Sequence, residues 1–417
     1  MGKSLKTSEP ENSRKMRGLT KWLRGSSATM SRKRTYLDWN ATAPLLDCAR
    51  DAVVSALALP GNASSVHVEG RAARALIDRA RDAVARLVGA KAANVTFVSG
   101  ATEAANMVLT PDFRMGRSSL KVLKLYVSAI EHPAVREGGR FGRADVVTFP
   151  VTQNGIVDLD ALERLLVAHD AAPGLPMVAL MLANNETGIL QPVAEVARIV
   201  RRAGGILVCD AVQAAGRVAV DMEALDADFL ILSAHKLGGP KGAGALISRG
   251  EVMMPAPLIR GGGHEKGHRA GTENIAAIAG FGAAAAFHAE GLDARMADLQ
   301  LKRDRFEAAI SEMCPDVIIH GRAGPRIANT SFFSVPGLKS ETGQIAFDLE
   351  GIALSAGSAC SSGKVGESHV LTAMGFDAKT GGLRVSLGTG TTEDDIEAAI
   401  AAFGKVLGRL NRQVTAA

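Results

Sequence analysis

A lysine and an aspartate each stand at the end of an apolar run near the middle of the chain. The run that begins at Phe229 closes in Lys236, and the run that begins at Ile206 closes in Asp210. Apolar runs of this length, separated by helix-like stretches, are typical of neighbouring parallel strands. Ligands bind beyond the carboxyl ends of such strands, so we expect both side chains to face one ligand site. A lysine that burial and nearby cations keep neutral can act there as a nucleophile.

Three more runs with the character of strands end in polar residues that suit a phosphorylated ring compound. The run 94–98 passes through Ser99 straight into a helical pattern, and the free N–H groups at a helix start hold phosphates well. The run 122–127 leads to His132, and the run 177–182 leads to Asn184 and Asn185. Five strand ends therefore converge on one crevice.

Nine short motifs, in order from about residue 36 to 390, resemble those of the fold-type I pyridoxal-phosphate (PLP) enzymes. Within these enzymes the motifs are most similar to the class V aminotransferase group, and there to the cysteine desulfurases of the NifS/IscS kind. The resemblance is carried by the segments 36–42, 99–106, 131–133, 184–188, 210–213, 233–236, 269–274, 357–360 and 383–388.

The resemblance implies an α/β fold with two domains. Strand-like and helix-like stretches alternate from Leu45 to Phe287, which indicates a doubly wound, mainly parallel sheet. We assign residues 45–287 to a large PLP-binding domain. Residues 35–44 and 288–417 would form a smaller α+β domain that carries the catalytic cysteine loop.

Each motif residue takes a role from the resemblance. Lys236 would hold PLP as a Schiff base, and Asp210 would keep the pyridine nitrogen protonated. His132 would stack on the ring and move protons. The remaining cofactor contacts would come from Ala101, Thr102, Asn185, Gln213, Ser233, His235 and, from the neighbouring subunit, Thr272. The resemblance therefore implies a homodimer with shared active sites.

Each residue also has a plainer interpretation when taken alone. Lys236 fits a surface lysine after a strand, Asp210 fits a helix N-cap, and His132 fits a loop histidine with satisfied hydrogen bonds. Their joint occurrence favours the cofactor roles.

Substrate binding is expected at Arg384, which stands in an apolar strand-like run. We expect the Arg384 guanidinium to bind the substrate α-carboxylate through two parallel hydrogen bonds, assisted by Asn40 and Asn185. The second interpretation is that Arg384 forms an internal salt bridge. Cys360 lies in a loop of small residues, 355–363, where an accessible thiol could reach the substrate and swing outward. A buried structural cysteine fits Cys209 better.

The implied function is a PLP-dependent cysteine desulfurase. It would convert L-cysteine to L-alanine and leave a persulfide on Cys360. A sulfur-acceptor protein, such as an iron–sulfur scaffold or a thiolation partner, would take the sulfur. The segment around Cys360 resembles the NifS/IscS branch more than the SufS branch. The alternative is another class V PLP enzyme, a selenocysteine lyase or an aminotransferase, in which Cys360 would be dispensable.

A zinc hydrolase is a third hypothesis, because His264 and His268 satisfy the H-E-x-x-H pattern. That pattern binds zinc only when a helix brings both histidines to one face. Gly261–Gly263 and Gly267 disfavour a helix there, so we expect no metal site.

Composition sets further limits. The 417 residues are 47% hydrophobic, which suffices for two domains. The apolar stretch 276–286 is too short and too rich in Ala and Gly for a membrane span. Four widely spaced cysteines without a CxxC pair are typical of a reducing compartment, so we expect a cytoplasmic protein.

Residues 1–34 hold ten Lys/Arg against two Glu, whereas the whole chain has a formal charge of +5. The rest of the chain is therefore slightly acidic. We expect residues 1–34 to be a disordered basic extension, with Met30 as a candidate natural start. A transit peptide in residues 1–29, which would direct the protein to an organelle matrix, and a nucleic-acid arm are the alternatives.

Overall fold

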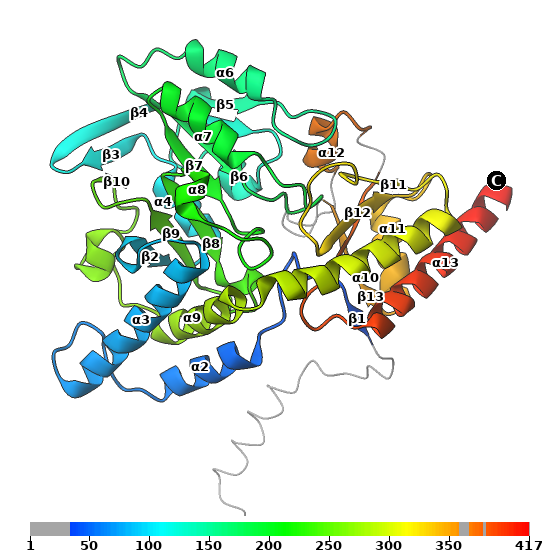
Figure 1. The fold of residues 1–417 in the computed structure, drawn as a ribbon, viewed down its shortest axis with the longest axis horizontal. Coiled ribbons are helices and arrows are strands. Elements are labelled where there is room, and N and C mark those ends of the chain that lie inside the picture. Colours follow the sequence, from blue (N-terminus) through cyan, green and yellow to red (C-terminus); the bar gives the residue numbers. More distant parts are fainter. Residues whose placement is uncertain (1–33, 358–366, 378–380, 417) are drawn as a thin grey trace, which may run out of the picture.

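The computed structural model describes residues 34–357, 367–377 and 381–416. The basic extension, apart from Arg34, and Cys360 lie outside these residues. One large sheet of nine strands follows the order β10-β3-β4-β6-β7-β8-β9-β2, and β5 pairs with β4 (Figure 1). The strands are β2 (Val95–Val98), β3 (Asp112–Met115), β4 (Ser118–Ser128), β5 (Val146–Phe149), β6 (Leu175–Met181), β7 (Ile206–Asp210), β8 (Phe229–Ser233), β9 (Gly244–Ser248) and β10 (Met253–Pro255).

The sheet is mainly parallel, as the sequence predicted. Strands β5, β4, β6, β7 and β8 pair in parallel. Strand β9 is antiparallel to both β8 and β2, so β2 again points the same way as β8. The five strand ends named from the sequence therefore lie at one edge of the sheet.

Helices cover both faces of the sheet, which explains the unbroken apolar runs. Leu207 and Cys209 belong to a core cluster with helices α3 (Val68–Leu87), α7 (Val193–Arg202) and α9 (Ile275–Ala289). Ile206 and Val208 belong to the cluster of the opposite face, with α4 (Ala101–Val108). Successive strand residues point to opposite faces, so a strand buried on both faces is apolar throughout.

A second, smaller unit follows in the chain. Its sheet has the order β11-β12-β15-β14, all antiparallel, and β1 pairs with β13 in parallel. The strands are β1 (Thr35–Tyr36), β11 (Ile318–Ile319), β12 (Thr330–Ser334), β13 (Ile352–Ala353), β14 (Ser355–Ala356) and β15 (Leu383–Ser386). Its helices are α10 (Leu292–Met313), α11 (Ser340–Leu349), α12 (His369–Ala373) and α13 (Glu393–Ala416).

The smaller unit has its own core cluster, which includes Leu37, Phe306, Phe347 and Phe403. Leu37 comes from the segment 35–44, which therefore packs with residues 288–417. The domain boundaries themselves stay a prediction. The remaining helices of the large unit are α2 (Asp47–Leu57), α5 (Pro133–Arg136), α6 (Leu159–Val167) and α8 (Met222–Leu225).

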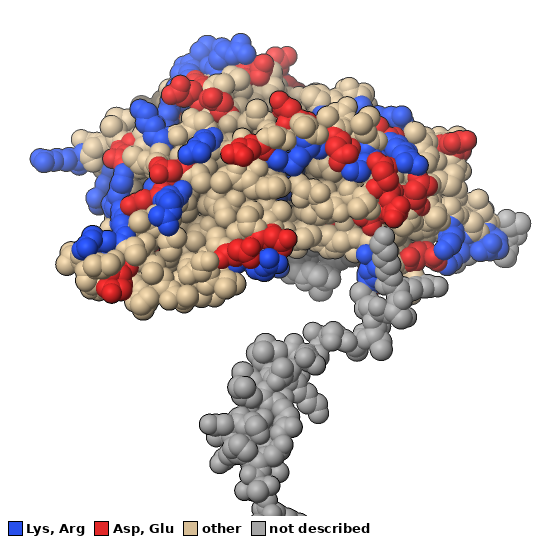
Figure 2. All heavy atoms as spheres, turned by 60° about the horizontal axis from the view of Figure 1, so that its bottom comes forward, with Lys and Arg blue, Asp and Glu red and all other residues tan. Residues whose placement is uncertain are grey.

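Within the described residues, no single helix is long and apolar enough to cross a membrane. Helices α9 and α10 meet the length and composition test only as a pair, and they bend by 80° at their junction. On the face shown in Figure 2, acidic and basic side chains of the described residues are intermixed, without a large patch of one charge.

Candidate active site

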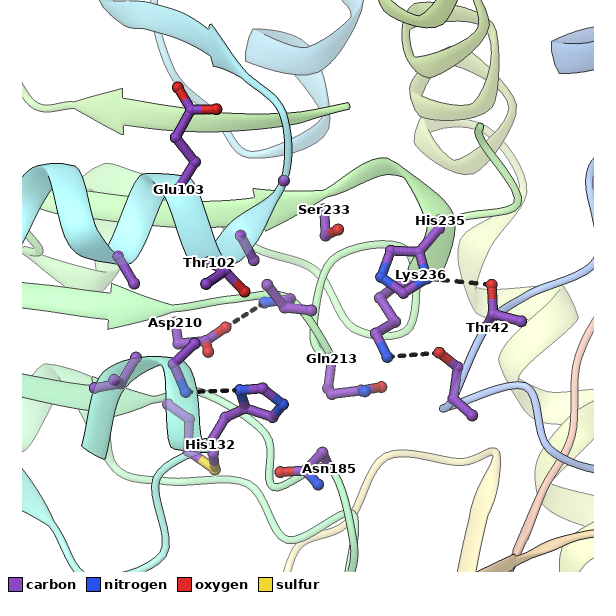
Figure 3. Close-up of a pocket in the computed structure, with 18 of the residues that line it drawn as sticks. Thr42, Thr102, Glu103, His132, Asn185, Asp210, Gln213, Ser233, His235 and Lys236 are labelled. Atoms are coloured by element: carbon purple, nitrogen blue, oxygen red, sulfur yellow. Dashed lines mark hydrogen bonds between the residues drawn. The ribbon is translucent and has the colours of Figure 1, made fainter. Parts of the chain in front are cut away.

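A pocket of about 570 Å³ opens where the five strand ends meet (Figure 3). Nine of the ten residues predicted to contact the cofactor line it. They are Ala101, Thr102, His132, Asn185, Asp210, Gln213, Ser233, His235 and Lys236. Strand ends more than 130 positions apart in the sequence thus contribute to one cavity.

Lys236 reaches the pocket through a single turn of 3-10 helix, Ala234–Lys236, that follows β8. Its Nζ donates hydrogen bonds to the carbonyl oxygens of Asn40, at 2.7 Å, and Ala41, at 2.8 Å. The neighbouring His235 ring nitrogen Nδ1 lies 3.1 Å from Thr42 Oγ1. The segment 40–42, which precedes the large domain, therefore contacts both Lys236 and His235.

Asp210 ends β7 and has a buried carboxyl group. Its Oδ1 accepts a hydrogen bond of 2.9 Å from the backbone N–H of Val212. Burial raises the pKa of Asp210 to about 6, against the opposing effects of this hydrogen bond and of the Lys236 charge. A buried carboxyl group of this kind gains most from a cationic partner, such as a protonated ring nitrogen. The bond to Val212 resembles a helix cap, and this cap is compatible with the cofactor role, which stays a prediction.

His132 stands at the start of the short helix α5. Its Nδ1 accepts a hydrogen bond of 3.1 Å from the backbone N–H of Ala134, which leaves the proton of the neutral ring on Nε2. Burial, with smaller contributions from Lys236 and His369, lowers the pKa of His132 to about 4. The ring is therefore neutral at pH 7 and can lie against an aromatic cofactor without the cost of burying a charge.

The start of α4 lies at the pocket, where the sequence predicted the phosphate contacts. Gly100 precedes the helix and provides no side-chain cap, so the first N–H groups of α4 are available to an anion. Thr102, Ser233 and His235 surround the same space (Figure 3). Together with Asp210 and Lys236, these donors match the phosphate, the ring nitrogen and the aldehyde of PLP.

Arg384 and Asn40 lie behind the pocket wall. Arg384 is buried and forms an ion pair of 2.7 Å with Asp38, and its Nη1 donates to the Asn185 carbonyl at 2.8 Å. The internal salt bridge, our second interpretation, is thus present. Arg384 Nε has no hydrogen-bond partner among the described residues. The Asn40 side chain donates to Thr330 Oγ1 at 2.9 Å. The substrate-binding role of both residues stays a prediction.

Thr272 does not line the pocket of its own chain. It is exposed at a smaller opening that shares Ser99 and Gly242 with the main pocket. A role in the neighbouring subunit stays a prediction. Cys360 lies outside the described residues, so its position relative to Lys236 is also untested.

The segment 264–267 does not form the α-helix that the H-E-x-x-H zinc pattern requires. It is a short 3-10 stretch in which Glu265 and Lys266 have left-handed backbone angles. The Glu265 carboxylate instead pairs with Arg81 at 2.7 Å and accepts the backbone N–H of Phe97. The described residues contain no group of three or more potential metal ligands.

Two residues near the site had no role in the sequence analysis. Glu131 is fully buried, and its Oε1 accepts a hydrogen bond from the backbone N–H of Met181. Burial, together with the nearby charge of Asp210, raises the pKa of Glu131 well above the usual range. Arg217 lies behind Gln213 and Lys236. Glu131 was considered only as the neighbour of His132 in the segment 131–133. Arg217 is the one charged residue among the mainly small and apolar residues 211–220, and this was the signal that could have identified it.

The fold matches that of the fold-type I PLP enzymes, and comparison with known proteins identifies the family. The aminotransferase class-V family matches residues 35–399. The chain is 35% identical over 390 residues to an IscS-like cysteine desulfurase of Mycobacterium tuberculosis. This alignment covers 92% of this chain and 98% of that protein. It is 38% identical over 390 residues to a cysteine desulfurase of Sinorhizobium fredii, with 90% and 97% covered.

The fold of a NifS-like protein from Rickettsia africae is similar, with a TM-score of 0.80 at 32% identity over 90% of this chain and 100% of that one. The chain belongs to the class-V aminotransferase family, among relatives that are cysteine desulfurases.

Proposed function

We propose that this protein is a PLP-dependent cysteine desulfurase that converts L-cysteine to L-alanine. The observation that carries the proposal is the joint placement of Lys236 and Asp210 at one pocket beside the uncapped start of α4. The identity of 34–38% to cysteine desulfurases supports this activity over the other class V reactions.

The residues of this chain would divide the work of the reaction. The α4 start, Thr102, Ser233 and His235 would bind the phosphate, and Asp210 would hold the proton on the ring nitrogen. When bound, PLP would supply an electron sink for the electrons left at the substrate α-carbon. The Lys236 amino group would first anchor the cofactor and, once released by the substrate amine, carry the α-proton.

Cys360 would perform the sulfur step. As a thiolate it attacks the substrate sulfur, so that a sulfur–sulfur bond forms and the carbon–sulfur bond breaks. The electron pair of the broken bond stays on carbon, which takes up a proton to give alanine. The product on the protein is a Cys360 persulfide, and a sulfur-acceptor protein such as an iron–sulfur scaffold would receive its outer sulfur.

Assembly and location complete the proposal. The exposed Thr272, at an opening next to the main pocket, supports a homodimer in which each subunit contributes to the other's site. The widely spaced cysteines support a cytoplasmic location.

A Cys360→Ala variant separates desulfuration from the other class V reactions. We expect it to keep the absorption band of bound PLP and to lose nearly all alanine release, because no thiolate takes the sulfur. Mass spectrometry should find a persulfide on the parent protein after incubation with L-cysteine and none on the variant. Cys48→Ser, which removes an exposed thiol on α2, is the matched control and should retain activity. Alanine release at the parent rate by Cys360→Ala would favour a lyase or aminotransferase.

A further inference from the structure

Arg217 is a buried cation directly behind the active-site pocket. The residue is 7% exposed, and burial together with the like charge of Arg384 lowers its pKa to about 9. Within the described residues, no carboxylate forms an ion pair with it. A buried guanidinium without an acidic partner is costly, so its hydrogen bonds need an explanation.

The chain turns sharply to bring Arg217 to this place. Gly216 has a φ of +73°, and a Cβ there would come within 2.7 Å of Leu237 and 2.9 Å of the His288 ring. Only glycine therefore fits the turn, and the turn directs the next residue beneath Lys236.

Three acceptors surround the Arg217 guanidinium. Nη1 donates to the backbone carbonyl of Gln213 at 2.8 Å and also to the Gln213 side-chain oxygen Oε1. Nη2 donates to the carbonyl of Lys236 at 3.4 Å. One side chain thus contacts both Gln213, which the family resemblance places at the phenolic oxygen of the cofactor ring, and Lys236, which would hold the cofactor.

The contact to Oε1 has a consequence for the Gln213 amide. A guanidinium has only hydrogen-bond donors, so it can bind the oxygen of the Gln213 amide but not the NH₂ group. The Gln213 Nε2 consequently faces the other way and donates to the Asn40 carbonyl at 3.0 Å. The same carbonyl receives the Lys236 Nζ. The second hydrogen of Nε2 remains for the pocket that Gln213 lines.

We propose that Arg217 is a positioning residue that orients the Gln213 amide, so that the pocket offers an N–H donor, not a carbonyl acceptor, to an anionic ring oxygen of the cofactor. A flipped amide would set two negative oxygens against each other. A lysine at 217 could not replace this function fully, because its single ammonium lacks the planar fork that reaches all three acceptors. The inference rests on the proposed PLP chemistry.

The first experiment follows the absorption band of bound PLP as a function of pH in the parent, Arg217→Met and Arg217→Lys. Loss of the Gln213 N–H donor would leave the ring oxygen of the cofactor more basic. Loss of the Arg217 charge would favour protonation of the nitrogen that joins Lys236 to the cofactor. Both effects raise the pH midpoint of the band. The other charged or titratable groups around the pocket are the same in all variants. They are Glu103, Glu131, His132, Asp210, His235, Lys236, Lys241 and Arg384.

We expect the midpoint to rise by about one pH unit or more in Arg217→Met and by less in Arg217→Lys. Arg303→Met is the matched control: Arg303 is also a buried arginine that donates to a backbone carbonyl, that of Ile327, outside the pocket. Its midpoint should equal that of the parent. An unchanged midpoint in PLP-loaded Arg217→Met would overturn the proposal. If Arg217→Met does not fold, the same criterion applies to Arg217→Lys.

The second experiment needs no cofactor and therefore separates this inference from the proposed function. Gln213→Glu places a carboxylate against Arg217, which can pair with it. In the Gln213→Glu/Arg217→Met double variant, the carboxylate is buried without that partner. The thermal midpoint of the cofactor-free double variant should fall by more than the sum of the two single losses. Additive losses would show that Arg217 does not hold this side chain.

Discussion

Arg384 on β15 and Asp38 after β1 form a buried ion pair, with Nη2 and Oδ1 2.7 Å apart and 346 positions between them in the chain. Ser355 Oγ donates a further hydrogen bond of 2.8 Å to the same carboxylate. Asp38 thus fixes the guanidinium from one side, while the Arg384 Nε keeps no partner among the described residues. Asp38 and the Asn185 carbonyl therefore hold Arg384 in place behind the pocket wall.

The two members of this pair should have separable effects. Asp38→Asn removes the negative partner of a buried cation, so we expect the free energy of unfolding to fall by about 3 kcal/mol. Arg384→Lys loses the bidentate geometry, and we expect KM for L-cysteine to rise by about tenfold, or about 1.4 kcal/mol. Denaturant unfolding and steady-state kinetics measure the two effects. A larger KM change in Asp38→Asn than in Arg384→Lys would contradict substrate binding by Arg384.

Lys236→Ala should abolish the imine-type absorption band of the PLP-loaded protein and lower turnover by orders of magnitude, because anchoring and proton transfer are both lost. Lys241 also lines the pocket and is the matched control. Lys241→Ala should keep a band that borohydride reduction traps as a covalent adduct on Lys236. Peptide mapping after reduction identifies the labelled lysine. An adduct on Lys241 in the parent protein would refute the assignment.

Asp210 should make the cofactor-free protein less stable as pH rises. Its folded pKa, about 6, lies above the ordinary value of 3.8, because burial outweighs the Val212 hydrogen bond and the Lys236 charge. The folded state therefore binds the proton more tightly, and this stabilisation is lost between about pH 4 and 6. At pH 7.5, Asp210→Asn should be more stable than the parent by about 3 kcal/mol, and the difference should vanish near pH 4. Urea unfolding of the cofactor-free proteins across this range provides the measurement.

Asp226→Asn is a control for this pH dependence, because the pKa of Asp226 is lowered in the folded state, whereas that of Asp210 is raised. Burial raises the pKa of Asp226, but the hydrogen bond and charge of Arg249, with those of Arg201, outweigh it and lower the pKa overall. Asp226→Asn should therefore be less stable than the parent at pH 7.5 and approach it at low pH. If the stability of both variants relative to the parent changed with pH in the same direction, the pKa of Asp210 would not be raised in the folded, cofactor-free protein.

Thr272 should act across the subunit interface. Mixed dimers of Thr272→Ala and Lys236→Ala chains would contain one site with both residues intact, if each site takes Thr272 from the partner. We expect the mixture to exceed the activity of either variant alone after subunit exchange. Sedimentation at the assay concentration checks the dimer. A fully active monomer would rule out a shared site.

The sequence predicted the large sheet and most pocket residues because both depend on local signals. Five apolar runs end in polar motif residues, and parallel strands necessarily bring such ends to one edge. Strand β9 was missed: Gly244–Ser248 is a short run of small and apolar residues without a polar ending of its own. Its antiparallel direction follows from the tertiary arrangement of β8 and β2.

The side-chain partners were harder to foresee than the strands. Arg384 stood out as a lone charge in an apolar run, but its partner Asp38 lies far away in the sequence. Arg217 is also a lone charge among mainly apolar residues, but the glycine turn that places it under Lys236 is visible only in the structure. Long-range contacts of buried polar groups decide both cases, and one sequence does not specify them.

The reversed strand β9 also has a consequence for synthesis of the chain. Among the strands that the structure describes, β2 pairs with β9 alone, and Val95 pairs with Ile247, 152 positions later. At roughly 5–20 residues per second, about 8–30 s separate the translation of the two strands. During that interval β2 lacks its partner strand β9, and the part of the sheet against which α4 packs is incomplete. The end of the pocket at the start of α4 is therefore completed late in synthesis, after more than half of the polypeptide has been translated.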